Sequence, residues 1–281
     1  MNVGVIFGVM QGRLSPPEDG RFQSFPRNSW REELFRAREA GLSYIEWIYD
    51  EYGSSLNPIT TNRGIAELNE LKRQSGIKTA AICADWLMDY PLIRCSPGQR
   101  ANRERVLHAL LHWGKEIGAS RVVLPFVDAS SIRTEEEKTV ALEVLERALP
   151  LSEETGVEMH LESDFAPGDF AAFLRRIPHP NIKVNYDTGN SSGLGYIASE
   201  EFGSYGHRIG SIHIKDRLRL PDGRVATKPL GEGSADFEDV FASIRRIGYC
   251  GGLTLQVARG EEGDEVNWIR QQLAFVRRYV S

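Results

Sequence analysis

Residues 157–214, VEMHLESDFAPGDFAAFLRRIPHPNIKVNYDTGNSSGLGYIASEEFGSYGHRIGSIHI, contain three short apolar runs separated by longer segments with helical spacing. The runs are Val157–Glu162, Ile182–Asp187 and Ile209–Ile214. Strands that alternate with helices are typical of a parallel sheet, because a crossover helix must return the chain to the starting end of the next strand. This stretch therefore predicts three consecutive βα units.

The same pattern extends over the whole chain. Five further runs have the same character: Val3–Met10, Tyr44–Ile48, Ile77–Ala84, Arg121–Val127 and Gly252–Val257. Eight runs in 281 residues give an average interval of about 35 residues, which suits a βα unit of roughly 30 residues or more. No linker divides the chain, so the sequence predicts an α/β fold, a single-domain (β/α)8 TIM barrel over residues 1–281. The longest connection, Arg217–Gly233, is predicted to be a binding loop or a lid.

The composition favours a protein that acts on small molecules. The net charge is −5, and the 34 basic residues are scattered among 39 acidic ones, so no basic stripe marks a nucleic-acid partner. Three widely spaced cysteines argue against a disulfide framework. The first apolar run, Val3–Met10, lacks the flanks of a signal peptide, and no run is long enough to span a membrane. We therefore expect a cytoplasmic location and no membrane partner.

Polar side chains stand at the ends of three consecutive predicted strands. Because strand residues alternate between the two faces, Glu162, Asp187 and His213 should all point into the barrel mouth, and Gln256 should join them from the eighth strand. One such residue would more often hydrogen-bond a loop. Four acceptor groups that converge would instead repel one another or stay unsatisfied, and a cation removes both problems. Their oxygen and nitrogen atoms suit one divalent ion: Mn²⁺, Co²⁺, Zn²⁺ or Mg²⁺.

These segments resemble the xylose isomerase-like TIM barrel family, which includes sugar-phosphate isomerases and epimerases, ketose 3-epimerases and the endonuclease IV superfamily. The resemblance covers essentially the whole chain. It rests on six motifs in order: Met10-Gln11-Gly12-Arg13-Leu14, Ile45-Glu46-Trp47, His160-Leu161-Glu162, Asp187-Thr188-Gly189-Asn190, His213-Ile214-Lys215-Asp216 and Leu230-Gly231-Glu232-Gly233.

The resemblance implies a metal-dependent sugar or sugar-phosphate isomerase or epimerase that abstracts a proton next to a carbonyl through an enediolate. It implies Glu162, Asp187 and His213 as metal ligands, with Glu162 also the catalytic base. Gln256 departs from the epimerase pattern, which has a second Glu there; an amide can offer an oxygen to a metal but cannot accept a proton at neutral pH. This departure favours aldose–ketose isomerisation with one base, unless Lys215, Glu232 or Glu46 supplies a second proton-transfer group.

Substrate contacts are expected from the loops and strand ends around the mouth. The candidate residues are Arg13, Glu46, Asn190, Lys215, Asp216, Lys228, Glu232 and Arg259. A phosphate could bind where Gly231–Ser234 precedes a helix, with Lys228 and Arg259 nearby. Alternatively, Ser234 only caps that helix and the arginines are solvated.

Two alternatives stay open at this point. A metal-dependent hydrolase or lyase could use the same barrel, and the barrel could bind a carbohydrate without catalysis, which Gln256 would permit. Endonuclease IV-like activity is disfavoured because Asn190 stands where that branch has one of its additional histidines. The expected partner is a small carbohydrate substrate, and barrels of this type often pair into homodimers.

Overall fold

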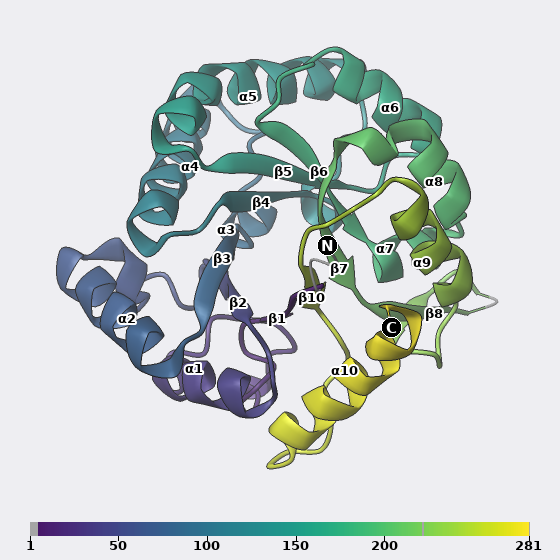
Figure 1. Cartoon of the computed structure of the whole chain (residues 1–281). Coiled ribbons are helices and arrows are strands. Elements are labelled where there is room, and N and C mark those ends of the chain that lie inside the picture. The colour runs from purple at the N-terminus through teal and green to yellow at the C-terminus, as the bar shows by residue number, and fades with distance from the viewer. Residues whose placement is uncertain (1–4, 221, 281) are drawn as a thin grey trace.

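Eight parallel strands close into a barrel in the computed structural model, which describes residues 5–220 and 222–280 (Figure 1). Around the barrel, the neighbouring strands follow the order β1-β10-β7-β6-β5-β4-β3-β2. The predicted (β/α)8 fold is therefore confirmed. The barrel strands are β1 (Phe7–Met10), β2 (Tyr44–Ile48), β3 (Lys78–Cys83), β4 (Arg121–Phe126), β5 (Glu158–Ser163), β6 (Ile182–Asp187), β7 (Ile209–Ile214) and β10 (Leu253–Leu255).

The strand bounds agree with the predicted runs to within a few residues. The ranges predicted for β2, β6 and β7 are identical to the observed ones. The first run was predicted to begin at Val3, which lies outside the described residues. The eighth run, Gly252–Val257, is wider than β10, because its last residues lie beyond the three that pair with β1 and β7.

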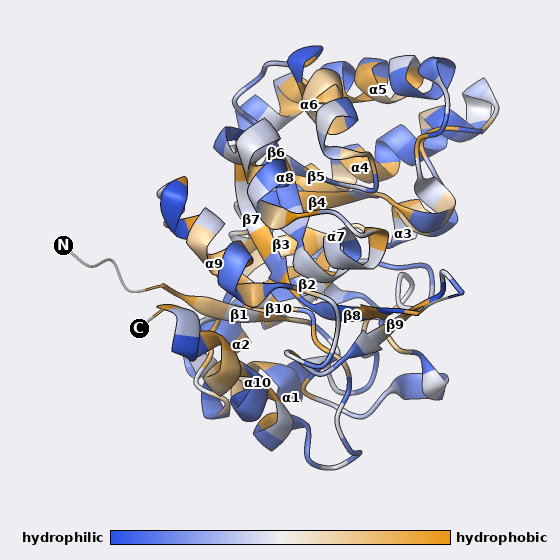
Figure 2. Cartoon of the chain, turned by 90° about the vertical axis from the view of Figure 1, so that its right-hand side faces the viewer, coloured by the Kyte–Doolittle hydropathy of each residue, from blue (hydrophilic) through white to orange (hydrophobic). Residues whose placement is uncertain are grey.

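Helices surround the barrel and bury their apolar faces against it (Figure 2). Thr134 opens α5 as predicted, by accepting a hydrogen bond from the Glu137 amide, and Gly156 closes that helix at a φ of 70°. No described helix combines the length and apolar character that crossing a bilayer requires. The helices are α1 (Trp30–Glu39), α2 (Asn62–Ser75), α3 (Trp86–Asp89), α4 (Pro97–Ile117), α5 (Glu135–Thr155), α6 (Pro167–Arg175), α7 (Thr188–Leu194), α8 (Ala198–Tyr205), α9 (Phe237–Arg246) and α10 (Glu265–Val280).

The ring of Tyr44 fills the barrel interior near the N-terminal ends of the strands. Its hydroxyl lies 3.0 Å from Thr254 Oγ1, and only 1% of Tyr44 is exposed. A Cβ atom at Gly8 would come within 2.1 Å of this ring, and one at Gly252 within 2.7 Å. Glycine at both positions therefore makes room for the tyrosine. The opposite, C-terminal ends of the strands form the mouth, where the long connections lie.

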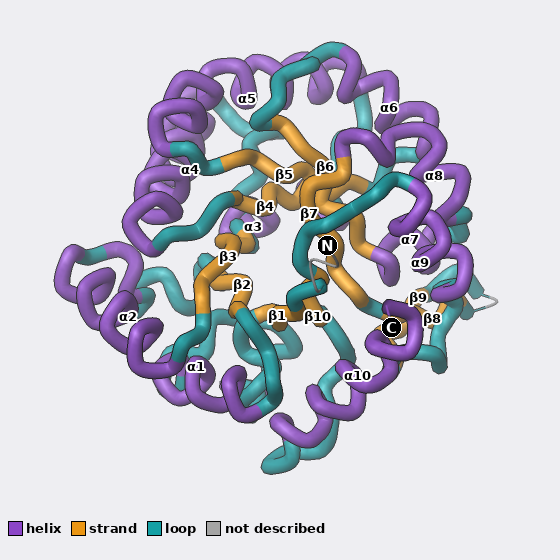
Figure 3. The backbone as a smooth tube through the Cα atoms, viewed as in Figure 1, coloured by secondary structure: helices purple, strands orange, loops and turns teal. Residues whose placement is uncertain are grey.

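The connection after β7, predicted as a long binding loop or lid over Arg217–Gly233, contains a hairpin that the sequence analysis did not predict. Strands β8 (Asp216–Arg219) and β9 (Val225–Lys228) pair antiparallel beside the barrel (Figure 3). Asp222-Gly223 lies between them, and Gly223 has a φ of 84°. A turn with a residue at positive φ favours glycine, and it brings the two strands into register.

Candidate metal centre

Glu162, Asp187 and His213 come together at the C-terminal ends of β5, β6 and β7. One potential ligand atom from each lies within 4.8 Å of the other two, and all three residues are buried. His213 Nδ1 lies 3.5 Å from Glu162 Oε2 and 3.9 Å from Asp187 Oδ2. Across residues 5–220 and 222–280, no other group of three or more His, Cys, Asp or Glu side chains meets this criterion. The three strand ends thus present two carboxylates and one imidazole to a common point.

Asp187 owes its position to the start of α7. Its Oδ1 accepts hydrogen bonds from the backbone amides of Gly189 and Asn190, at 2.9 and 2.8 Å, and so caps the helix. This contact uses one carboxylate oxygen and holds the side chain in a single orientation. The other oxygen, Oδ2, is left facing His213 and Lys215.

The imidazole of His213 is held from behind by Glu46 on β2. His213 Nε2 donates to Glu46 Oε1 at 2.7 Å, and both side chains are fully buried. Asn185 Nδ2 lies 3.1 Å from His213 Nδ1 and donates to Glu162 Oε2 at 2.9 Å. Because Nε2 is taken up by Glu46, Nδ1 is the ring nitrogen that faces the carboxylates of Glu162 and Asp187. A carboxylate behind the imidazole is the usual arrangement around a metal-binding histidine.

The charges of this cluster favour a cation. Burial alone would lower the pKa of His213, but the charge of Glu46 and hydrogen bonds with Glu162 and Glu46 outweigh it and raise that pKa to about 10. Burial likewise opposes ionisation of Glu46, yet His213 and Arg121 bring its pKa below the usual value. Positive charge is thus strongly stabilised between these carboxylates. Two carboxylate oxygens and an imidazole nitrogen form a donor set that fits a divalent ion.

Gln256 and Lys215 lie beside the three residues. Lys215 Nζ is 3.5 Å from Asp187 Oδ2, 3.3 Å from Asn190 Oδ1 and 3.3 Å from Gln256 Oε1. Asn190 in turn donates from Nδ2 to Glu162 Oε1 at 2.5 Å. The structure therefore brings Lys215, Asn190 and Gln256 to the cluster, and the amide oxygen of Gln256 is turned toward it.

Glu46 and Asp216, two of the predicted substrate contacts, are engaged within the protein. Glu46 lies beneath His213, and Arg121 is 3.7 Å away. These two basic groups balance the buried charge of the Glu46 carboxylate. Asp216 accepts hydrogen bonds from the backbone amides of Gly231, Gly233 and Ala235, at 2.9, 2.9 and 3.1 Å. Asp216 thereby fixes the loop that precedes α9.

Arg13 and Arg259 both hold the connection between β1 and α1. Arg13 donates to the carbonyls of Val257 and Phe22, and Arg259 donates to those of Phe22 and Ser15. Burial, followed by the charge of Arg259, lowers the pKa of Arg13 to about 9. These guanidinium groups stabilise a loop over the mouth, in contrast to the solvated arginines of the alternative reading.

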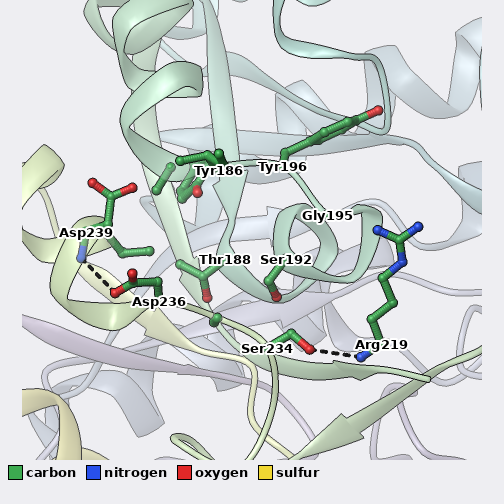
Figure 4. A pocket seen from close by; sticks show the side chains of 13 residues that line it. Tyr186, Thr188, Ser192, Gly195, Tyr196, Arg219, Ser234, Asp236 and Asp239 are labelled. Carbon is green, nitrogen blue, oxygen red and sulfur yellow. Dashed lines mark hydrogen bonds between the residues drawn. The ribbon is translucent and has the colours of Figure 1, made fainter. Parts of the chain in front are cut away.

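The remaining predicted contacts lie at the rim. Lys228 is half-buried at the end of β9, and Glu232 is exposed in the next loop. Asp236 caps α9 by accepting from the Asp239 amide, so the proposed capping role of Ser234 is wrong. Ser234 Oγ instead accepts a hydrogen bond from the Arg219 amide (Figure 4).

Sequence reasoning missed the part that Gln23 plays. Its side chain meets Arg13, Asp85 and Gln256 over the mouth, although Gln256 is 233 residues away in the chain. No local pattern could have indicated this contact. Asn185 had a usable signal, because it precedes Asp187 by two residues and therefore shares its strand face.

Besides a void of only about 10 Å³ that Glu162 and Asp187 line themselves, two cavities lie near the cluster. The larger, of about 420 Å³, is formed by α7, α8, α9 and β8, with Thr188, Ser192 and Arg219 among its lining residues (Figure 4). None of Glu162, Asp187 and His213 lines it. The smaller, of about 180 Å³, is lined in part by Asn190, Arg217 and Asp164. Since Asn190 also contacts Glu162, this smaller cavity adjoins the cluster.

Comparisons with known proteins agree on one family. Residues 34–279 match the family model described as xylose isomerase-like TIM barrel. The L-ribulose-5-phosphate 3-epimerase UlaE of Shigella flexneri is 21% identical over 236 residues, which cover 81% of this chain and 82% of that one. The solved structure of the IOLI protein with a binding zinc atom superposes with a TM-score of 0.79 at 16% identity, covering 98% of this chain and 99% of that one. A structure of L-ribulose 3-epimerase gives 0.77 at 17% identity, covering 99% and 95%.

Proposed function

Because the chain belongs to the xylose isomerase-like TIM barrel family, we propose that it is a divalent-metal-dependent sugar isomerase or epimerase. One observation carries the proposal: one potential ligand atom from each of Glu162, Asp187 and His213 lies within 4.8 Å of the other two. The relatives support the substrate class, since they include an L-ribulose-5-phosphate 3-epimerase and an L-ribulose 3-epimerase. The substrate is accordingly a small carbohydrate.

Glu162, Asp187, His213 and the Gln256 oxygen would hold one ion, which could be Mn²⁺, Co²⁺, Zn²⁺ or Mg²⁺. When bound, such an ion polarises a carbonyl and stabilises the negative charge of an enediolate. Asp187 and His213 arrive already oriented, by the helix cap and by Glu46 respectively. The site therefore needs little rearrangement to accept the ion.

Glu162 is the base in this proposal. Asn185 donates to one of its oxygens and Asn190 to the other, so the carboxylate is held in one plane at the mouth. A carboxylate fixed in this way can take a proton from the carbon next to the carbonyl and return it. The cavity lined by Asn190 and Arg217 adjoins this group and would receive the rest of the sugar.

The choice between isomerisation and epimerisation depends on a second proton-transfer group. Gln256 cannot accept a proton, which favours isomerisation with Glu162 alone. Among the three possible replacements, Glu46 is enclosed beneath His213 and Glu232 is exposed at the rim. Lys215, whose Nζ lies 3.3 Å from Gln256 Oε1, is the one at the centre and supports epimerisation as the second candidate.

The test combines metal analysis of the purified protein with turnover of ketoses and their phosphates in D₂O. We expect one ion per chain and exchange of a substrate proton with solvent. Glu162→Gln should reduce the exchange rate by roughly 10²- to 10⁴-fold, the usual contribution of a general base. Glu154→Gln, an exposed change on α5, serves as the matched control.

The products separate the candidates. Proton transfer with retained configuration at every exchangeable carbon indicates isomerisation. Inversion of a carbon, with exchange of its proton for solvent deuterium, indicates epimerisation. Hydrolysis or elimination products would replace the proposal by a hydrolase or lyase. Tight sugar binding without any proton exchange would replace it by a carbohydrate-binding barrel.

A further inference from the structure

Gln23 joins three strand ends across the mouth of the barrel. Its Oε1 accepts hydrogen bonds from Arg13 Nη2 and from Gln256 Nε2, both at 3.0 Å. Its Nε2 donates to Asp85 Oδ2 at 2.8 Å. Gln23 belongs to the connection between β1 and α1, whereas Asp85 follows β3 and Gln256 follows β10. The side chain therefore bridges segments that are far apart in the sequence.

The partners of Gln23 decide which way its amide points. A guanidinium has only donors, so the Gln23 atom that faces Arg13 must be the oxygen. The nitrogen then faces the carboxylate of Asp85, which accepts. Both contacts agree, and reversing the amide would break both of them. Gln23 is thus held in one orientation.

The orientation of the Gln23 amide also determines the orientation of the Gln256 amide. Because the oxygen of Gln23 faces Gln256, the Gln256 atom 3.0 Å away must be its nitrogen. The oxygen of Gln256 then faces the cluster, where Lys215 Nζ, another group with donors only, lies 3.3 Å from it. Two independent donors, Arg13 and Lys215, therefore require the same arrangement of the two amides.

The orientation matters because Gln256 has only one oxygen. A glutamate could offer either of its two equivalent oxygens to a metal ion, whereas a reversed amide would offer NH₂, which does not bind a cation. A residue that prevents the reversal would keep the Gln256 oxygen facing the metal ion, as one oxygen of a carboxylate always can.

We propose that Gln23 is a positioning residue, which turns the Gln256 oxygen toward the metal centre and so enables an amide to serve as the fourth ligand. The inference rests on the proposed function, since it concerns the same centre. The surrounding loop is built to support it, because Arg13 and Arg259 both donate to the carbonyl of the preceding residue, Phe22, at 2.9 Å. Gln23 is therefore anchored through its backbone neighbour as well as its side chain.

The test is a double-mutant cycle read by calorimetric titration of Mn²⁺ into the metal-free protein. Gln23→Met keeps the size of the side chain and removes its acceptor. In the natural background we expect Mn²⁺ affinity to fall about tenfold or more, since residues that orient metal ligands contribute about 10- to 100-fold. In a Gln256→Glu background, either carboxylate oxygen can face the ion, so Gln23→Met should change affinity less than about threefold. Gln74→Met, on the exposed part of α2, is the control for the substitution itself.

A merely structural role of Gln23 would give a different result. Equal losses in both backgrounds would show general damage to the loop and overturn the inference, as would unchanged affinity in the natural background. Either result leaves the proposed function standing, provided that the natural protein binds Mn²⁺. If the natural protein binds no divalent ion, the proposed function fails and the inference fails with it. Thermal unfolding of the metal-free variants confirms that each one is folded.

Discussion

His213 Nε2 on β7 donates to Glu46 Oε1 on β2 over 2.7 Å, so a hydrogen bond crosses the buried interior of the barrel between strands 167 residues apart. It fixes the imidazole plane and leaves Nδ1 toward Glu162 and Asp187. The charge of Glu46 also makes the imidazole a stronger electron donor. A residue with no access to solvent thereby controls a ligand at the mouth.

Replacing Glu46 by Gln should weaken metal binding. The amide keeps the size of the side chain but loses the charge behind His213, so we expect Mn²⁺ affinity to fall by about 10- to 100-fold. Titration calorimetry measures this directly, with Glu154→Gln on α5 as an exposed control. An affinity equal to that of the natural protein would show that Glu46 has no influence on the centre.

Mn²⁺ should stabilise the folded protein. At a free concentration of 100 times Kd the gain is about 2.7 kcal/mol, which raises Tm by roughly 5 °C or more for a chain of this size. In Asp187→Asn this rise should disappear, whereas the helix cap survives because Asn is also a good capping residue. Differential scanning calorimetry with and without Mn²⁺ provides the measurement. An undiminished rise in Asp187→Asn would exclude Asp187 as a ligand.

His160 should make the protein sensitive to acid. Burial, only partly offset by a hydrogen bond with Glu158, lowers the pKa of His160 from 6.5 to about 4. The unfolded state therefore binds this proton first as the pH falls. The resulting stability is fully present above pH 6.5 and is lost between pH 6.5 and 4, by about 3 kcal/mol in total.

The His160→Gln variant isolates that contribution. Glutamine can keep a hydrogen bond to Ser211 or to Glu158 but does not titrate, so its free energy of unfolding should depend less steeply on pH between 6.5 and 4. Urea unfolding at several pH values tests this. Parallel pH profiles for the two proteins would mean that His160 does not carry the effect.

Asp216→Asn should destabilise the fold. The carboxylate accepts three backbone hydrogen bonds from the loop 231–235, and an amide would place its NH₂ group against at least one of these donors. We expect a loss of about 1–3 kcal/mol in the free energy of unfolding, measured with urea. Asp222→Asn, at the exposed hairpin turn, should change it by less than about 0.5 kcal/mol. A loss of similar size in both variants would contradict the role assigned to Asp216.

The strands could be predicted because their periodicity is strong and local. Alternation within β5, β6 and β7 also placed Glu162, Asp187 and His213 on one face, and the closed barrel then brought their ends together. The hairpin of β8 and β9 was not anticipated, although Asp222-Gly223 is a recognisable turn signal.

The functions of individual polar residues were harder to foresee. A sequence shows that Arg13 and Arg259 carry guanidinium groups, but the carbonyls of Ser15, Phe22 and Val257 become their partners only through the path of a loop. Gln23 is the extreme case, because its contact with Gln256 depends on closure of the entire barrel. Such long-range hydrogen bonds have no period or motif.

The Tyr44 ring, enclosed between Gly8 and Gly252, blocks the lower end of the barrel. A reactant consequently has one route in, and a product has to leave by the same route. Substrate and product therefore compete for the same open end of the barrel. Accumulated product should slow turnover as a competitive inhibitor, whatever sugar the centre transforms.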